Sequence, residues 1–85
     1  MEERLRIFKA LSDETRLRIL DFLAGGEKCV CEIIPHVGRT QSTVSIQLAK
    51  LESLGILRSR KDGRSVYYAL DDGKTKKILG LFRRN

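Results

Sequence analysis

The sequence predicts a mainly α-helical domain with a small β-hairpin, in the order α-α-α-α-β-β-α. Three observations support this prediction. Apolar residues recur at helical spacing through roughly the first two thirds of the chain. The apolar period then changes to two on either side of an Asp-Gly pair, which is typical of a tight hairpin turn. Helical spacing returns near the end of the chain.

Length and composition predict one small domain. The chain has 85 residues, of which 41% are hydrophobic and 33% charged, and this length is too short for two independent cores. We therefore expect residues 1–85 to form a single domain. No apolar run approaches the roughly 18 residues that a membrane span needs, and the N-terminal segment lacks the apolar stretch of a signal peptide. These features predict a cytoplasmic protein without a membrane partner.

A polar break separates the first two predicted helices. The apolar stripe of the first helix is formed by Leu5, Ile7, Phe8 and Leu11. Asp13 then stands at a favourable N-cap position, and Glu14 suits the first turn of the second helix because the helix dipole is positive there. The second helix keeps its apolar spacing as far as Ala24, where the pair Gly25-Gly26 ends it.

A third, short helix is predicted over Val30–Val37. Cys29 stands at its N-cap, and Glu32 falls at the third helical position. Pro35 should kink or shorten this helix, because proline removes one backbone hydrogen bond. Gly38 provides the turn that follows.

The fourth predicted helix begins at Thr40 or Gln41 and reaches Leu54, before Gly55. Its apolar face is formed by Val44, Leu48, Leu51 and Leu54. After it, the chain is expected to form two strands, Ile56–Lys61 and Arg64–Leu70, joined by a turn at Asp62-Gly63, and then a last helix over Lys74–Arg84.

The third helix, its glycine turn and the fourth helix have the spacing of a helix-turn-helix, and a basic hairpin directly after them is typical of a wing. We therefore predict a winged helix-turn-helix domain that binds DNA. The net charge is +6, from 17 Lys and Arg against 11 Asp and Glu, which makes a nucleic acid the leading partner.

The outer face of the fourth helix carries small, polar or apolar side chains and no acid, so it can enter a major groove without repelling phosphate. The candidate DNA-binding residues of this helix are Gln41, Ser42, Thr43, Ser45, Ile46, Gln47 and Lys50. The hairpin adds Arg58, Arg60, Lys61 and Arg64. A solvated edge whose charge prevents aggregation is the alternative interpretation of the hairpin.

Four segments of the chain carry a further pattern. They are Ala10–Leu20, Glu27–Ile33, Gln41–Ser45 and Asp62–Tyr68. Together, in this order and spacing, they resemble the ArsR/SmtB family of metalloregulatory repressors. The resemblance implies a winged helix-turn-helix homodimer that represses an operon by binding a palindromic operator in double-stranded DNA, and that leaves the DNA when a metal or metalloid binds.

The same resemblance implies that the first and last helices form the dimer interface. The candidate interface residues are Leu5, Phe8, Ile78, Leu79 and Phe82. Capping of the monomer's own core is the alternative role for these side chains.

Cys29 and Cys31 are the candidate inducer site, because their segment is similar to the family's arsenic-sensing motif. A thiol at a helix N-terminus favours the thiolate form, which binds soft ions such as As(III). The expected reducing compartment argues against a structural disulfide. Residues two apart on a continuous helix point about 200° apart, so we expect both sulfurs to reach one ion only if the helix start opens. Neither thiol is expected on the DNA-facing surface, and no obligatory cofactor is predicted.

Several positions depart from the family pattern. Ile34 stands where related arsenic sensors often have a third cysteine, and Gln47 where the family often has a histidine. Only Asp71 and Asp72 lie near the start of the last helix, so the family's zinc site there is not expected. The single histidine, His36, is interpreted as a solvated or satisfied side chain rather than a ligand.

Other function classes remain open. One is a winged-helix regulator without metal sensing, in which the cysteines serve thiol redox chemistry or are two small buried side chains. Another is a small basic protein that binds RNA or the ribosome. An enzyme of thiol chemistry, such as an arsenate reductase, is disfavoured because the chain has no Cys-X-X-Cys motif and no phosphate-binding loop.

Overall fold

Five helices and three strands make up residues 2–83, the part of the chain that the computed structural model describes. In chain order they are α1 (Glu3–Leu11), α2 (Glu14–Leu23), β1 (Lys28–Cys29), α3 (Val30–Val37), α4 (Gln41–Ser53), β2 (Leu57–Asp62), β3 (Ser65–Leu70) and α5 (Gly73–Leu81). The predicted mainly helical fold is confirmed. One element was missed, because the two-residue strand β1 is too short to show an apolar period.

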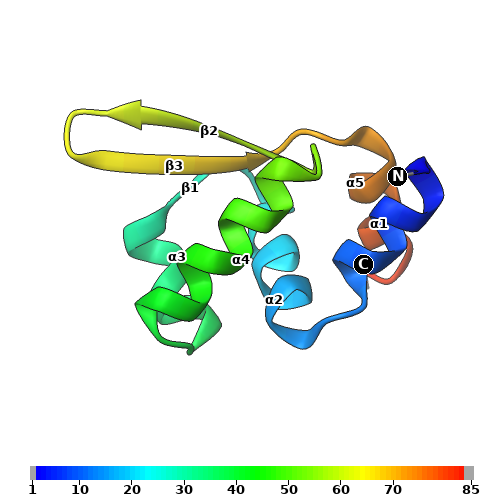
Figure 1. Ribbon diagram of the computed structural model, residues 1–85, viewed down its shortest axis with the longest axis horizontal. Helices are drawn as coiled ribbons and strands as arrows, with labels where there is room; N and C mark the ends of the chain where they lie inside the picture. Colours follow the sequence, from blue (N-terminus) through cyan, green and yellow to red (C-terminus); the bar gives the residue numbers. More distant parts are fainter. Residues whose placement is uncertain (1, 84–85) are drawn as a thin grey trace.

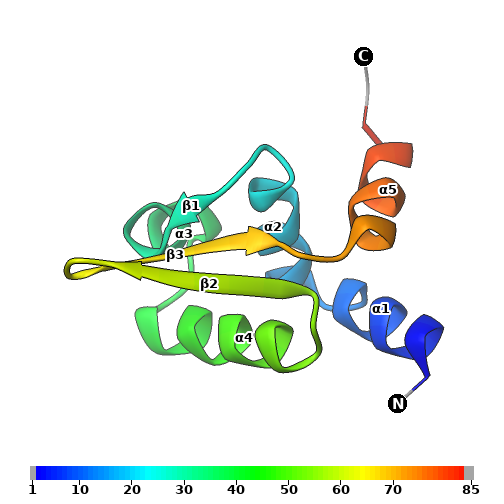
Figure 2. The ribbon, with the colours of Figure 1, turned by 90° about the horizontal axis from the view of Figure 1, so that it is seen from above.

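The three strands form one antiparallel sheet in the order β1-β3-β2. Figure 1 shows this sheet along one side of α2, α3 and α4, with the tip of the β2–β3 hairpin reaching beyond the helices. Seen from above, α4 and the β1–α3 segment lie on opposite sides of the hairpin, and α1 and α5 stand at the end away from its tip (Figure 2). This is a winged helix-turn-helix, in which α3 and α4 are the two helices and the hairpin is the wing.

One apolar core holds α2, α3 and α4 to the base of the sheet. Its largest fully buried apolar side chains are Ile19, Leu20, Leu23, Ile33, Val37, Val44, Leu48, Leu51 and Ile56. These positions recur every three or four residues within each helix, so the spacing that predicts a helix also predicts its buried face. Leu54, which was predicted on the same face, is the C-cap of α4 and is only half-buried.

The hairpin turn lies one residue later than predicted. Asp62 pairs with Ser65, so the two-residue loop is Gly63-Arg64 rather than Asp62-Gly63. Gly63 has φ +62°, and no non-glycine residue in the described chain has a positive φ. A positive φ at the first loop position alone is the pattern of a type II′ turn, which favours glycine there.

The last helix is shorter than predicted. It covers Gly73–Leu81, and Phe82 is its C-cap. The predicted end at Arg84 lies outside the described residues. Asp72 begins the helix, because its carboxylate accepts a hydrogen bond from the backbone N–H of Lys74 at 3.1 Å.

Arginine side chains tie α1 to α4. The guanidinium of Arg16 donates to the backbone carbonyls of Lys9 (3.0 Å) and Ala10 (3.3 Å) and to the side-chain oxygen of Gln47 (3.1 Å). Arg6 of α1 donates to the carbonyl of Leu54, the C-cap of α4, at 2.7 Å. The position of α4 is therefore linked to that of α1.

The Arg16 contacts predict a measurable coupling with Gln47. We expect Arg16→Lys to lower the free energy of unfolding by about 1–3 kcal/mol, because a lysine ammonium lacks the planar fork that reaches separate acceptors. Gln47→Ala should cost about 0.5–1.5 kcal/mol alone and less in the Arg16→Lys background. Urea unfolding of the two single variants and the double variant measures this. Strictly additive losses would show that the two side chains act independently.

Candidate nucleic-acid interface and thiol pair

The turn between α3 and α4 is fixed by a glycine and a threonine. Gly38 ends α3 in the left-handed conformation, with φ +74°. Thr40 is the N-cap of α4, and its side-chain oxygen accepts from the backbone N–H of Thr43 at 3.2 Å. These two caps set where α4 begins relative to the rest of the helix-turn-helix.

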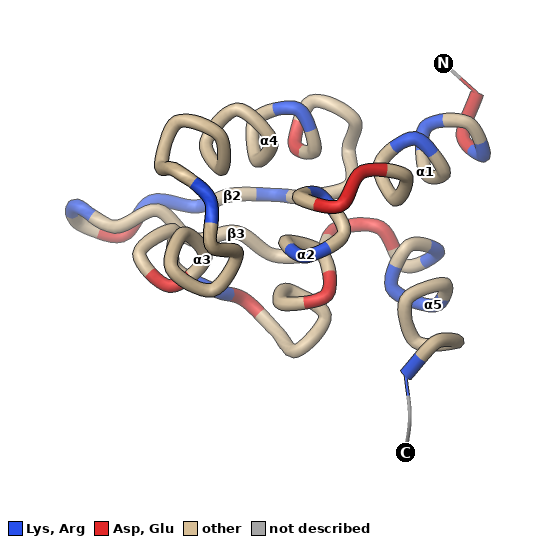
Figure 3. The backbone as a smooth tube through the Cα atoms, turned by 90° about the horizontal axis from the view of Figure 1, so that it is seen from below, with Lys and Arg blue, Asp and Glu red and all other residues tan. Residues whose placement is uncertain are grey.

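The outer face of α4 is exposed and free of acid in its first turns. The predicted DNA-binding residues that it exposes are Gln41, Ser42, Ser45, Ile46 and Lys50. Figure 3 shows this helix uncharged over most of its length, with a basic and an acidic position near its C-terminal end. The acid is Glu52, which accepts a hydrogen bond from Ser59 of the wing at 2.6 Å. The exposed face of α4 therefore presents no negative charge in its first turns.

Two predicted DNA-binding residues are instead engaged within the protein. Gln47 is half-buried and accepts from Arg16, and Thr43 is half-buried beside the hydroxyl of Thr40, at 3.0 Å. A helical wheel could have predicted that Gln47 is partly buried, because it places Gln47 about 60° from the buried Val44.

The four basic side chains of the wing fall into two groups. Arg58 pairs with Asp71 at 3.1 Å, and Arg60 forms two hydrogen bonds with Glu27, at 2.7 and 2.8 Å. Lys61 and Arg64, at the end of β2 and in the turn, have no ion-pair partner within residues 2–83. Figure 3 shows basic positions along β2 and at the hairpin tip. The tip therefore carries the cations that remain available to a phosphate backbone.

The Glu27–Arg60 pair anchors the wing to the loop before β1. Arg60 also lies over the ring of Tyr67, 4.5 Å from its centre. The hydrogen bond from Arg60 lowers the pKa of Glu27 below its ordinary value of 4.5, and the same bond raises the pKa of Arg60. No local pattern in the sequence predicts this pair, because 33 positions separate its members.

This pair predicts a loosening of the wing in acid. Because the folded-state pKa of Glu27 is lowered, its contribution is present at neutral pH and is lost as the pH falls below 4.5 through that lowered value. We expect the side-chain N–H signal of Arg60 in NMR spectra to broaden and exchange faster over that range. Glu27→Gln should show the fast exchange at every pH, and an Arg60 signal that is unchanged in Glu27→Gln would contradict the pairing.

Cys29 belongs to two elements at once. As the last residue of β1 it pairs with Tyr67 of β3, and as the N-cap it begins α3. Its backbone N–H donates to the side chain of Glu32 at 3.0 Å, and its sulfur accepts from the N–H of Cys31 at 3.1 Å. The predicted N-cap and third-position glutamate are confirmed as a capping box. A change at Cys29 therefore reaches both the wing sheet and the helix-turn-helix.

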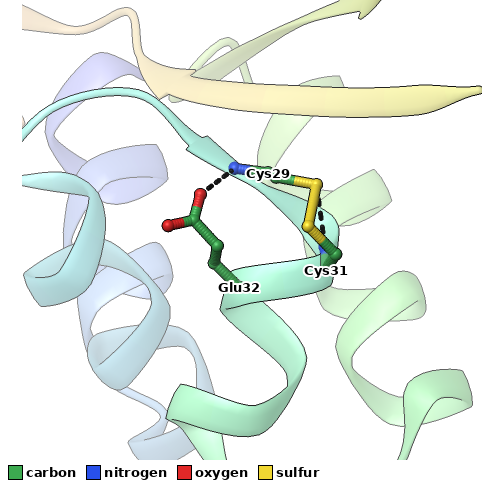
Figure 4. The surroundings of a disulfide bond; sticks show 3 residues. All are labelled: Cys29, Cys31 and Glu32. Atoms are coloured by element: carbon green, nitrogen blue, oxygen red, sulfur yellow. Dashed lines mark hydrogen bonds between the residues drawn. A yellow bond between two sulfur atoms is a disulfide. The ribbon is translucent and has the colours of Figure 1, made fainter. Parts of the chain in front are cut away.

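The sulfurs of Cys29 and Cys31 are bonded to each other (Figure 4), so the expectation of two free thiols is wrong for this structure. The expectation that the helix start must open is also wrong. Cys29 is extended, with φ −71° and ψ 145°, rather than helical. The Cα atoms lie 5.1 Å apart, within the range that a disulfide permits. This backbone brings both sulfurs within reach of one atom.

A groove of about 490 Å³ opens beside the cysteine pair, between α3, α4 and the wing. Its lining residues are Cys29, Val30, Cys31, Ile34, Gln41, Ser45, Leu48, Arg64, Ser65, Val66 and Tyr68. Cys29 is only 5% exposed, whereas Cys31 is exposed. The pair thus shares one hollow with candidate DNA-binding residues of α4 and the wing. That neither thiol lies on the DNA-facing surface stays a prediction.

In the disulfide form neither sulfur is a thiolate, so the pair could supply two sulfur ligands only after reduction. Within residues 2–83, no group of three or more His, Cys, Asp or Glu side chains is placed to hold a metal ion. The Glu32 carboxylate faces the backbone nitrogen of Cys29, on the side away from the sulfurs (Figure 4). His36 instead stacks on Phe22, with ring centres 3.8 Å apart. The residues present fit a thiophilic species that takes two protein ligands.

The outer ends of α1 and α5 present apolar side chains to solvent. The exposed fractions are 51% for Leu5, 58% for Phe8, 81% for Leu81 and 82% for Phe82. Of the other candidate interface residues, Ile78 is half-buried, and Leu79 is only 4% exposed because it packs in the chain's own core. Leu79 is therefore not available to a partner, whereas the exposed side chains are.

The described fold places the chain in the class of winged helix-turn-helix proteins, and sequence comparison defines the family. Residues 13–59 match the model of the bacterial regulatory protein, arsR family. The chain is 43% identical over 75 residues to a cadmium resistance transcriptional regulatory protein CadC homolog of Staphylococcus aureus. It is 42% identical over 81 residues to an HTH-type transcriptional regulator of Methanocaldococcus jannaschii, covering 94% of this chain and 91% of that protein. The chain belongs to the ArsR family.

The match to the staphylococcal protein covers 87% of this chain, but the chain spans only 62% of that protein's length. The chain likewise spans 62% of the length of a protein of Streptomyces lividans named as a probable mercury resistance operon repressor. Within residues 2–83 there is no helix whose length and apolar character would let it cross a bilayer.

Solved structures agree with the fold. HlyU from Vibrio cholerae has a TM-score of 0.87 at 32% identity, covering 95% of this chain and 92% of that chain. The AntR antimony-specific transcriptional repressor has a TM-score of 0.85 at 36% identity, covering 93% and 72%. A homodimeric winged helix-turn-helix DNA-binding domain from Mycobacterium bovis has a TM-score of 0.82 at 35% identity, covering 92% and 72%.

Proposed function

We propose that the protein is a homodimeric, sequence-specific DNA-binding repressor that a soft metal or metalloid, such as As(III), releases from its operator by binding Cys29 and Cys31. One observation carries the proposal: the cysteine pair joins the wing sheet to α3 and lines the same groove as Gln41 and Ser45 of α4. Similar proteins include a cadmium resistance regulator and an antimony-specific repressor, which supports a soft inducer.

In this proposal α4 enters the major groove, and Gln41 and Ser42 contact base edges at its N-terminal end. Lys61 and Arg64 of the wing contact phosphates. Two copies related by a twofold axis would present two such helices to a palindromic operator. The operator half-sites should then lie about 10 base pairs apart.

Release follows from the shared groove. A species held by the two sulfurs occupies the hollow in which Gln41, Ser45 and Arg64 lie, so these side chains cannot keep their positions on DNA. Ion and DNA therefore bind different forms of the protein. By linkage, each should weaken the other by the same factor, typically about 5–150-fold.

The DNA prediction separates base reading from phosphate contact. We expect Ser42→Ala to reduce discrimination among duplexes selected from a random library. Lys61→Ala or Arg64→Ala should weaken binding to every duplex and reduce the salt dependence by about one unit of slope, because each removes about one phosphate contact. Arg58→Ala is the matched control, since Arg58 already pairs with Asp71. Fluorescence anisotropy across salt concentrations measures both effects.

Equal affinity for selected and random duplexes at all salt concentrations would contradict sequence-specific binding. Preference for single-stranded or structured RNA over any duplex DNA would favour the alternative of an RNA-binding protein.

The thiol prediction concerns a double variant, Cys29→Ser with Cys31→Ser. Serine keeps an N-cap acceptor at position 29, so this variant should fold and bind the operator. It should no longer release DNA when arsenite is added, whereas the reduced wild type should. Anisotropy of a labelled operator duplex, titrated with arsenite, Cd(II) and Sb(III), measures release. Release from the double variant at the wild-type concentration would place the inducer site elsewhere.

The dimer prediction uses the exposed side chains of α1 and α5. Phe8→Lys with Phe82→Lys should convert a dimer to a monomer in sedimentation experiments, because burial of each phenyl ring stabilises association by about 1.5–3 kcal/mol and a charge there opposes it. The core should be unaffected, since both rings are more than half exposed. Lys77→Ala on α5 is the control. A variant that stays dimeric would show that the interface lies elsewhere.

A second candidate function rests on the Cys29–Cys31 disulfide. A regulator that responds to oxidation would bind its operator differently in the disulfide and dithiol forms, without any metal. Comparison of operator affinity before and after reduction by a phosphine distinguishes this candidate from the first. Equal affinities of the two forms would remove it.

A further inference from the structure

We propose that a hollow between α1 and the C-terminal end of α4 binds a backbone phosphate of the DNA that lies between the two operator half-sites. This inference rests on the proposed function, and it adds a DNA contact outside the helix-turn-helix and the wing. The α1–α4 hollow has a volume of about 400 Å³. Its lining residues are Lys9, Ser12, Arg16, Lys50, Ser53 and Leu54.

The lining of the α1–α4 hollow holds three basic side chains and no acid. Lys9 of α1 and Lys50 of α4 are exposed, and neither has an ion-pair partner within residues 2–83. The two acids adjacent to lining residues in the sequence are turned to other partners. Asp13 accepts from a backbone N–H in the first turn of α2 at 3.0 Å, and Glu52 accepts from the wing at 2.6 Å. The two lysines are therefore available to an anion.

The third basic side chain, Arg16, is already held in position. Its guanidinium donates three hydrogen bonds, to the backbone carbonyls of Lys9 and Ala10 and to the side chain of Gln47. A guanidinium has five N–H groups, so two of them remain for an anion. A guanidinium that is fixed in advance loses little side-chain freedom on binding, and phosphate oxygens suit its geometry.

The helix ends at the α1–α4 hollow oppose an anion, but the basic side chains exceed their effect. The last turns of α1 and α4 both lie there, and each C-terminal end carries a partial negative charge of about half a unit. Arg6 donates to the carbonyl of Leu54 at 2.7 Å, which compensates part of the charge at the end of α4. Three positive side chains against about one negative unit charge leave the hollow positive.

The α1–α4 hollow lies at the far end of the exposed stripe of α4. On a helical wheel Ser53 lies about 20° from Ser42, the residue proposed to contact base edges. The two residues are about 16 Å apart along the helix axis. Because the major groove is about 12 Å wide, a helix whose first turn meets base edges extends past the groove wall at its other end, where phosphates lie.

The neighbouring helix α1 places this phosphate between the half-sites. Figure 2 shows α1 next to the C-terminal end of α4, away from the hairpin tip, and Arg6 links the two helices. Because the proposed dimer interface includes α1, the hollows of the two copies would flank the twofold axis. The wing tips would lie toward the outer ends of the operator. The two hollows therefore face the backbone of the central segment.

The test measures how Lys9→Ala, Lys50→Ala and the double variant bind a duplex that the wild type selects from a random library. Each single variant should weaken binding roughly five- to tenfold at about 0.1 M salt and lower the salt slope by about one unit, because it removes one phosphate contact. Lys77→Ala is the matched control, because Lys77 is an exposed lysine of α5 and its loss changes the net charge equally. Fluorescence anisotropy at several salt concentrations measures both quantities.

Neutral methylphosphonate linkages locate the contact on the DNA. When they replace the phosphates between the half-sites, the wild type should fall to the affinity of the double variant, and the double variant should lose no more. When they replace phosphates outside the half-sites, both proteins should lose affinity by the same factor.

Thermal unfolding separates the alternative role of the two lysines. Each lies in the last turn of its helix, where a cation stabilises the helix through the helix dipole. If this were their only role, the variants would melt at lower temperature and keep the wild-type salt slope, which would overturn the inference. A double variant whose effect persists in full on duplexes with neutral central linkages would also overturn it.

Two further outcomes are distinct. Inorganic phosphate, added at constant ionic strength, could shift the amide signals of Ser12 and Ser53 saturably while the lysine variants bind DNA normally. The hollow would then hold a free anion, and the inference would be wrong. If the wild type binds selected and random duplexes equally, sequence-specific repression fails, whereas the salt slopes still show whether the hollow holds a DNA phosphate. If the wild type binds no duplex, both proposals fail.

Discussion

The double role of Cys29 constrains the wing and the helix-turn-helix together. Its backbone is extended because it pairs with Tyr67 in the wing sheet, and the same extended conformation makes it the N-cap of α3. Its side chain consequently turns back over the first turn of α3 and meets Cys31. The wing and the helix-turn-helix are thus joined through one residue, and that residue carries one of the two sulfurs.

The position of α4 is fixed from its other side by polar contacts. Arg16 holds Gln47 in the middle of the helix, and Arg6 holds the carbonyl of Leu54 at its end. The first turn of α4, which contains Gln41, faces the groove and lacks such restraints from α1. Under the proposed function, a species in the groove would lie against this first turn, which is also the end of the helix proposed to read DNA.

Local signals predicted most of the fold. Apolar spacing, Asp13, Cys29 and Gly38 predicted the helices and their caps, because these features act within one or two turns. Contacts between distant positions were not predictable in this way. The pairing of Cys29 with Tyr67, the Glu27–Arg60 pair and the shared groove depend on how the wing folds back over α3. The expectation of free thiols had another origin, since it came from the expected reducing compartment and not from the position of Cys29.

The central claim is that the cysteine pair couples the wing to the helix-turn-helix, so that a ligand bound to the two sulfurs changes both. Amide hydrogen exchange on the reduced protein, with and without one equivalent of arsenical, tests this claim most directly. The account predicts changed exchange in the β1–β3 pairing, in the first turn of α3 and in the first turn of α4 together, with α5 unchanged. Changes confined to residues 29–32, with the wing and α4 unaltered, would contradict it.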